Sequence, residues 1–260
     1  MAWPIWWRTE VLSSRPPLAE PRRDTLRSTL ADLRGTQKPP YGVSIYSVSV
    51  NRPAGRIIAA AAHLAGLTPN AVTGLSALSS LSAIAVLILR SPTVLTGCVA
   101  AALLALGFAL DSADGQLARL HGSGGPPGEW LDHLVDCSVK LALHGGVAVA
   151  WYREGVRGAL LLVPMAFQAV AVLLFFGGTL AGLLLARAPN DPSRRPGAAQ
   201  SGRRSLLGLL PVDFGVLCWS FALWGWSPLF RTWYGLLLVV QSLYLAVLSR
   251  HWWRQLHASR

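Results

Sequence analysis

Long apolar runs fill most of the chain after its first quarter and predict membrane-spanning helices. A helix needs about 20 predominantly apolar residues to cross the hydrocarbon core of a bilayer, and each run has roughly that length. We place six spans at residues 70–89, 93–118, 130–151, 158–186, 206–224 and 229–249. The pattern therefore predicts an all-α, polytopic membrane protein with six transmembrane helices.

The chain before the first span is more polar and predicts two shorter helices. Asp24 is a candidate N-cap for a helix that runs to about Leu33, and a Pro-rich link follows it. Residues 53–67 are rich in alanine but carry basic side chains, so we expect an amphipathic helix that lies in the membrane interface. The predicted organisation is a cytosolic tail at 1–45, a membrane domain at 46–250 and a cytosolic tail at 251–260.

Composition and charge agree with a membrane protein. Hydrophobic residues make up 52% of the chain and charged residues 13%, whereas a soluble domain has roughly 25% charged residues. The net charge of +11 would suit a nucleic acid, but the basic residues lie in the tails and loops, where they suit anionic lipid headgroups. We therefore expect contact with the lipid bilayer and none with nucleic acid.

The distribution of basic residues predicts how the protein is oriented. If the N-terminus is cytosolic, eighteen lysines and arginines lie on the cytosolic side and four on the far side. Loops rich in Lys and Arg stay in the cytosol, so this bias favours that orientation. We expect an integral protein of the plasma or inner membrane, with both termini facing the cytosol.

Four aspartates with fixed spacing lie where the second and third spans meet their connecting loop. The pattern reads Asp111-x2-Asp114-Gly115-x2-Ala118-Arg119-x8-Gly128-x3-Asp132-x3-Asp136. Steps of three and four residues place each pair of acids on one stripe of its helix. The Gly- and Pro-rich loop at 121–127 lets the chain return antiparallel, so both stripes can face one volume on the cytosolic side. Carboxylates near hydrocarbon are costly unless they are paired, wetted or metal-bound, which marks this cluster as the candidate site.

The residue types in this cluster indicate its chemistry. Converging carboxylates repel one another and require cations, and hard oxygen ligands suit Mg²⁺, Mn²⁺ or Ca²⁺ better than zinc. Gly115 and Ala118 leave room for a bulky ligand, and Arg119 offers a fork suited to phosphate. The arrangement supports a metal-bridged diphosphate substrate with one carboxylate left over as a base.

This pattern resembles the signature of the CDP-alcohol phosphatidyltransferases, and every fixed position of that signature is matched. The stretch Pro69-Asn70-x2-Thr73, where the first span begins, resembles a further family feature near the nucleotide. The resemblance covers roughly residues 50–250. It implies an enzyme of phospholipid biosynthesis that transfers a phosphatidyl or similar substituted phosphate group from a CDP-linked lipid to an alcohol, with release of CMP.

The resemblance also implies roles for individual residues. Asp111, Asp114 and Asp132 would hold two divalent ions, Mg²⁺ or Mn²⁺, against the diphosphate, with Asp136 completing the shell. Asp136 would also be the catalytic base that takes the proton from the acceptor hydroxyl. The implied contacts of the CDP moiety are Asn70, Thr73, Asp114, Gly115, Ala118, Arg119 and Gly128.

The acceptor site is less well defined by the sequence. Lys140 and His144 continue the stripe of Asp136 in four-residue steps, and we expect Lys140 to shape an acceptor cavity. The alternative for Lys140 is that it only pairs with Asp136. For His144, a role in the acceptor cavity and a purely structural role both stay open. Arg203 and Arg204 are candidates for an acceptor phosphate, with membrane anchoring as the alternative.

Two other interpretations of the chain remain at this point. The same acids would serve a divalent-cation transporter, although transporters more often place their ligands near the membrane midplane on broken helices. A catalytically silent scaffold is disfavoured because all four aspartates are present. Gly178-x3-Gly182 predicts a close helix-packing face, for which a homodimer is one use.

Overall fold

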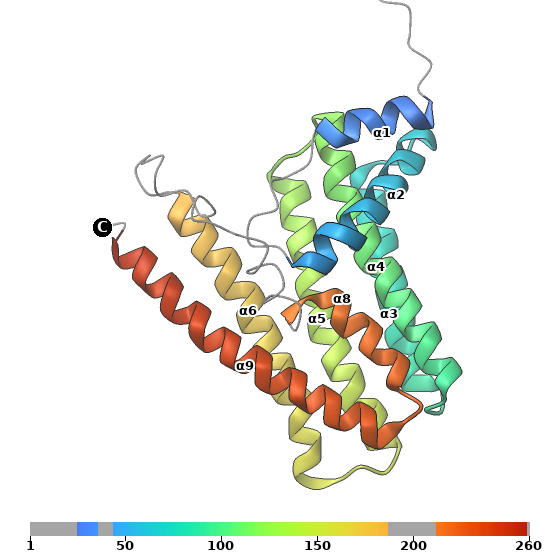
Figure 1. Ribbon diagram of the computed structural model, residues 1–260, viewed down its shortest axis with the longest axis vertical. Coiled ribbons are helices and arrows are strands. Elements are labelled where there is room, and N and C mark those ends of the chain that lie inside the picture. The colour runs from blue at the N-terminus through green and yellow to red at the C-terminus, as the bar shows by residue number, and fades with distance from the viewer. Residues whose placement is uncertain (1–24, 36–43, 187–211, 259–260) are drawn as a thin grey trace, which may run out of the picture.

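The computed structural model describes residues 25–35, 44–186 and 212–258, and within these ranges every regular element is a helix (Figure 1). The elements are α1 (Leu26–Gly35), the π-helix η1 (Ser47–Asn51), α2 (Arg52–Leu64), α3 (Pro69–Leu89), α4 (Val94–His121), α5 (Pro126–Arg153), the 3-10 helix η2 (Gly158–Leu161), α6 (Leu162–Ala186), α8 (Phe214–Ser220), the 3-10 helix η5 (Phe221–Leu223) and α9 (Ser227–Ala258). The predicted all-α class is confirmed.

Five helical segments of the described chain are long and apolar enough to cross a membrane. They are α3, α4, α5, the combined segment Gly158–Ala186, and α9. Five of the predicted spans therefore have a matching helix. The sixth, at 206–224, appears as the short apolar helix Phe214–Leu223, and 206–211 lie outside the described residues. At about 1.5 Å per residue that helix is too short to cross a bilayer alone, so the count of six is not confirmed.

The outer faces of the long helices carry large apolar side chains. Leu78, Leu95 and Leu243 are 63%, 74% and 65% exposed. Such exposure is costly in water but natural against lipid chains, so these side chains face the bilayer. The protein is thus an integral membrane protein, with α6 and α9 packed together beside the bundle of α3, α4 and α5 (Figure 1).

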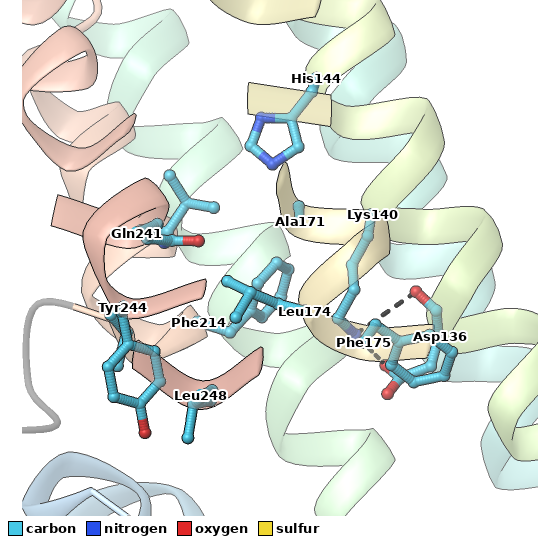
Figure 2. Close-up of a pocket in the computed structure, with 12 residues that line it drawn as sticks. Asp136, Lys140, His144, Ala171, Leu174, Phe175, Phe214, Gln241, Tyr244 and Leu248 are labelled. Atoms are coloured by element: carbon cyan, nitrogen blue, oxygen red, sulfur yellow. Dashed lines mark hydrogen bonds and ion pairs between the residues drawn. The ribbon is translucent and has the colours of Figure 1, made fainter. Parts of the chain in front are cut away.

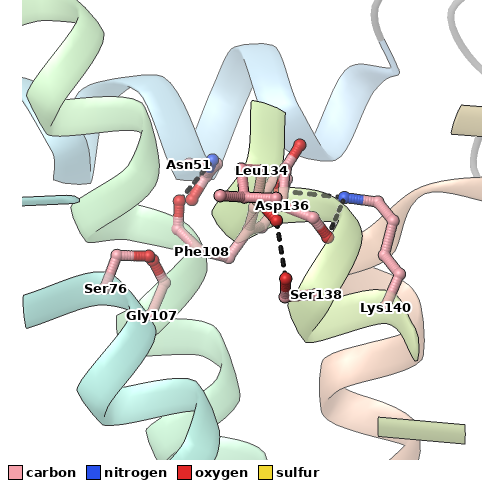
Figure 3. A network of polar contacts seen from close by, with 8 residues as sticks. All are labelled: Asn51, Ser76, Gly107, Phe108, Leu134, Asp136, Ser138 and Lys140. Atoms are coloured by element: carbon pink, nitrogen blue, oxygen red, sulfur yellow. Dashed lines mark hydrogen bonds and ion pairs between the residues drawn. The ribbon is translucent and has the colours of Figure 1, made fainter. Parts of the chain in front are cut away.

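Small and hydroxylated residues bring α3 and α4 close together. Ser76 Oγ donates to the carbonyl of Gly107 at 2.8 Å, and Ser79 Oγ donates to the carbonyl of Leu103 at 2.8 Å (Figure 3 shows the first). A Cβ added to Gly107 would lie 2.3 Å from Ser80 Oγ, so only glycine permits this approach. Small residues and interhelical hydrogen bonds drive packing in membranes. This contact fixes α4 one turn before Asp111.

The predicted interfacial helix packs across α4. Asn51, which precedes α2, donates from Nδ2 to the carbonyl of Phe108 at 3.2 Å (Figure 3). A Cβ on Gly55 would lie 2.8 Å from Ser112 Oγ, and Gln116 Nε2 donates to the carbonyl of Arg52 at 3.2 Å. The helix α2 therefore braces the same part of α4 that α3 holds from another side.

The predicted short helix near the N-terminus is present as α1. Thr25 and Ser28 bond each other reciprocally at its start, with Thr25 N donating to Ser28 Oγ at 3.0 Å and Ser28 N to Thr25 Oγ1 at 3.3 Å. This exchange satisfies backbone donors that the first turn of a helix leaves free. The cap is thus Thr25, and the predicted cap Asp24 lies outside the described residues.

Asp213 has a structural part in the fold. Its Oδ1 accepts from the backbone N of Gly215 at 2.6 Å and so caps α8. Its Oδ2 accepts from the hydroxyls of Ser44 and Ser47, the latter at 2.7 Å. One carboxylate therefore starts α8 and ties it to the segment before α2, 166 residues earlier in the sequence.

Candidate functional site

The acidic stripes of α4 and α5 meet at one point. Carboxylate oxygens of Asp111, Asp114 and Asp132 all lie within 4.8 Å of one another. The connection that allows this is the one predicted: Gly122 ends α4 in the left-handed conformation (φ 60°), and α5 begins at Pro126. Left-handed backbone favours glycine at the end of a helix. We call these three aspartates the acidic cluster.

Thr73 on α3 holds one member of the acidic cluster. Its hydroxyl lies 2.6 Å from Oδ2 of Asp114 and 3.1 Å from the carbonyl of Pro69. A hydroxyl has one proton to donate. The carboxylate of Asp114 is the closer and more strongly accepting partner, so we assign the proton to that bond. Asp114 is only 5% exposed, so this bond fixes the orientation of a buried carboxylate. The sequence placed Thr73 near the site without showing which group it bonds.

Asp136 lies outside the acidic cluster and makes an ion pair instead. Its Oδ1 lies 2.9 Å from Nζ of Lys140, one turn farther along α5 (Figures 2 and 3). The ammonium also lies 4.9 Å from the ring centre of Phe175 and 5.4 Å from that of Phe214. Lys140 therefore does pair with Asp136, and two aromatic rings cover the cation.

A cavity of about 700 Å³ opens beside the acidic cluster. Its lining includes every residue predicted to contact the CDP moiety: Asn70, Thr73, Asp114, Gly115, Ala118, Arg119 and Gly128. The Gly-rich loop 123–125 and Asp132 also line it, and we call it the donor cavity after the predicted CDP contacts. A Cβ on Gly115 would come within 3.3 Å of Arg119 Nη1, so glycine leaves the guanidinium its position at the wall.

A second cavity, of about 280 Å³, has Asp136 in its wall. Asp136, Lys140 and His144 form its wall on α5, while α6, α8 and α9, together with Val212 just before α8, supply the remaining side chains (Figure 2). We call it the acceptor-side cavity. Two polar residues here, Gln241 and Tyr244, were not predicted, although a glutamine inside an apolar run is a recognisable signal. The candidates Arg203 and Arg204 lie outside the described residues.

His144 is buried at one end of the acceptor-side cavity. Its Nδ1 lies 2.5 Å from the hydroxyl of Tyr234, and its ring stacks on Phe167 with centres 4.2 Å apart. The side chain is 1% exposed and Tyr234 is fully buried. These contacts fix the orientation of the imidazole ring in the cavity wall.

The acidic cluster fits a divalent cation. Three carboxylates from two helices would repel one another at this separation, and Asp114 is buried, so a bound cation would relieve the repulsion. Oxygen ligands of this kind suit Mg²⁺, Mn²⁺ or Ca²⁺. The residues that are present therefore agree with the predicted metal chemistry.

Comparison with protein families finds one match over most of the chain. The family model described as CDP-alcohol phosphatidyltransferase matches residues 66–247. This range contains the acidic cluster, Thr73 and Asp136. No curated protein matches the chain.

Proposed function

The chain belongs to the CDP-alcohol phosphatidyltransferase family, and from this membership we propose that it moves a phosphatidyl, or other substituted phosphate, group from a CDP-linked lipid to an alcohol and releases CMP. The family supports transferase activity in a membrane, with a divalent metal. The observation that carries the finer proposal is that Asp114 and Asp132 of the acidic cluster line one cavity, while Asp136, one turn farther along α5, lines a second.

The donor cavity suits the CDP end of the lipid. Gly115 and Ala118 have small side chains on one face of α4, so a nucleotide can approach the helix backbone there. Arg119 lines this cavity and would bind a phosphate through its planar fork, and the loop 123–125 forms part of the same wall. The diphosphate would then lie against Asp114 and Asp132.

We assign Asp111, Asp114 and Asp132 as the metal ligands, with two divalent ions, Mg²⁺ or Mn²⁺, as the proposed occupancy and Asp136 as a further ligand. When bound, such ions supply positive charge against the diphosphate and the leaving CMP. The chain's own task is to hold the carboxylates in position, which Thr73 does for Asp114.

In this proposal Asp136 serves both substrates. It lies one turn from Asp132 along α5, a rise of about 6 Å, and it lines the acceptor-side cavity. In the proposed reaction its carboxylate takes the proton of the acceptor hydroxyl, the alcohol oxygen bonds to phosphorus, and the bond from phosphorus to the CMP oxygen breaks. Lys140 orients the carboxylate through the 2.9 Å ion pair.

The cellular setting is part of the proposal. Exposed apolar helix faces support a membrane location, and the basic tails and loops favour the plasma or inner membrane with the site and both termini on the cytosolic side. A homodimer also stays a proposal. A Cβ on Gly178 would lie 3.5 Å from Trp252 of the same chain, whereas Gly182 has open space around it.

The test is release of CMP from CDP-diacylglycerol by the purified protein with Mg²⁺ or Mn²⁺, across a panel of alcohols. Asp136→Asn should abolish turnover and retain binding of the CDP-lipid, while Asp32→Asn on the exposed face of α1 should behave as wild type. Equal turnover in Asp136→Asn would refute the assignment of the base. Uptake of divalent ions into proteoliposomes without CMP release would favour the transporter instead.

A further inference from the structure

We propose that the acceptor-side cavity selects a small, uncharged alcohol with several hydroxyls, and that His144 and Gln241 are specificity-determining residues for it. The inference rests on the proposed function, because it names the substrate class of the same site. It is carried by the size of the cavity, the charges along it and the polar groups at the end away from Asp136.

The size of the acceptor-side cavity limits what enters it. Its volume of about 280 Å³ lies just below the range of roughly 300–1,000 Å³ that is usual for ligand pockets. The donor cavity, at about 700 Å³, is much larger. A compact polyol fits the smaller space, whereas a second nucleotide-sized molecule does not.

The charges of the described residues that line the acceptor-side cavity disfavour an anionic acceptor, and the inference therefore departs from the prediction that Arg203 and Arg204, outside the described residues, bind an acceptor phosphate. Among its lining residues that the structure describes, Lys140 is the one lysine or arginine, and it already pairs with Asp136 at 2.9 Å. The rings of Phe175 and Phe214 also lie near that ammonium, so an anionic acceptor would have to share a cation that already has partners. A phosphate or carboxylate group would have to lose its hydration and approach the negative charge of Asp136. It would also compete with Asp136 for the ammonium of Lys140. Burying such a charge without a partner is costly.

The end of the cavity offers neutral hydrogen-bonding groups instead. Since Nδ1 of His144 bonds the hydroxyl of Tyr234, Nε2 is the ring nitrogen left for a ligand. Gln241 on α9 is 6% exposed and lines the same cavity, and its amide has both donors and an acceptor. Figure 2 shows His144 and Gln241 on neighbouring walls, apart from the Asp136–Lys140 pair. A hydroxyl is the ligand group that can donate to one and accept from the other.

The positions of His144 and Asp136 along α5 predict how an acceptor alcohol is oriented in the cavity. His144 lies two helical turns beyond Asp136 on α5, with Lys140 between them. An alcohol that bonds His144 and Gln241 through one hydroxyl would present another hydroxyl toward Asp136. A polyol can therefore form hydrogen bonds at both ends of the cavity, whereas a monohydric alcohol has a hydroxyl for only one end.

The experiment compares matched acceptors, using the full chain in detergent or nanodiscs with CDP-diacylglycerol and Mg²⁺. Glycerol is paired with glycerol 3-phosphate and inositol with inositol phosphate, and CMP release gives kcat/KM for each. We expect at least about a tenfold preference for the unphosphorylated member of the preferred pair. This comparison needs no variant and so does not depend on folding of a mutant.

Variants of α9 then test the assigned residues. Gln241→Leu should lower kcat/KM for the preferred polyol about tenfold, mainly through KM, because one or two hydrogen bonds to the substrate are lost. The matched control is Ser242→Ala, since Ser242 Oγ bonds the carbonyl of Leu238 at 2.8 Å within its own helix and does not line the cavity. It should match wild type.

Two results would overturn the inference while leaving the proposed function intact. One is a wild-type preference for the phosphorylated acceptors; the other is an unchanged kcat/KM for every acceptor in Gln241→Leu. Absence of CMP release with every acceptor tested would refute the proposed function itself, and the inference with it.

Discussion

Replacing Thr73 by valine should weaken metal binding without removing a metal ligand. Valine has nearly the shape of threonine but lacks the hydroxyl that lies 2.6 Å from Oδ2 of Asp114. Thr73 is 4% exposed, so water does not easily take the place of that hydroxyl. Asp114 would keep its charge and lose the group that orients it.

The size of the effect follows from the kind of bond that is lost. A hydrogen bond to a charged group contributes about 1.5–3 kcal/mol, which corresponds to roughly a tenfold to hundredfold change in an equilibrium constant. Loss of a group that orients a metal ligand typically reduces metal affinity by about 10–100-fold, in agreement with that range. We therefore expect the Mg²⁺ or Mn²⁺ concentration for half-maximal CMP release to rise by about 10–100-fold, with most of kcat recovered at saturating metal.

The assay is a metal titration of CMP release at fixed CDP-diacylglycerol and acceptor. Thr73→Ser keeps the hydroxyl and should stay near wild type. Ser79→Ala is the matched control, because it removes a 2.8 Å hydrogen bond from α3 to the carbonyl of Leu103, away from the acidic cluster. The reasoning fails if Thr73→Val titrates as wild type, or if Ser79→Ala shifts the titration equally.

Three further predictions concern stability and metal. Gly107→Leu should lower the melting temperature in detergent by several degrees, since overpacking costs about 1–3 kcal/mol; Gly74→Ala, where a Cβ meets nothing within 4 Å, should leave it nearly unchanged. Asp213→Ala should destabilise the protein by about 2 kcal/mol or more, measured by the same melting assay, because it removes the cap of α8 and strands the hydroxyls of Ser44 and Ser47. A chelator should abolish CMP release, and added Mg²⁺ or Mn²⁺ should restore it; activity that survives chelation would contradict the metal assignment.

Much of the fold follows from hydrophobic runs and helix breakers. Spans separated by Gly- and Pro-rich loops agree with the structure, because both the run and its ends are visible in the sequence. The helix α9 continues to Ala258, past the predicted end at 249, since hydropathy falls there but no Gly or Pro stops the helix. The helix α8 starts only at Phe214, because Asp213 caps it. An apolar count over 206–224 does not register that cap.

The candidate site also has features that the sequence predicts and features that it does not. The pairing of Asp136 with Lys140 could be predicted from helical spacing alone, and the acidic cluster from that spacing together with the Gly- and Pro-rich loop that lets α5 return beside α4. The contact of His144 with Tyr234 joins residues 90 positions apart. No local pattern predicts such a contact, since it depends on how α9 packs against α5.

The arrangement separates the two substrate choices along the chain. In the proposed function, donor binding depends on α3, α4, the start of α5 and the Gly-rich loop between α4 and α5; Thr73 and the acidic cluster lie on these helices. The acceptor-side cavity adds α6, α8 and α9, and α5 is the helix common to both cavities. From the proposed function we therefore expect substitutions on α9 to change the preferred alcohol without moving a proposed metal ligand. In such variants the metal titration should stay at its wild-type midpoint while acceptor preference shifts, which a combined titration of Gln241→Leu would measure directly.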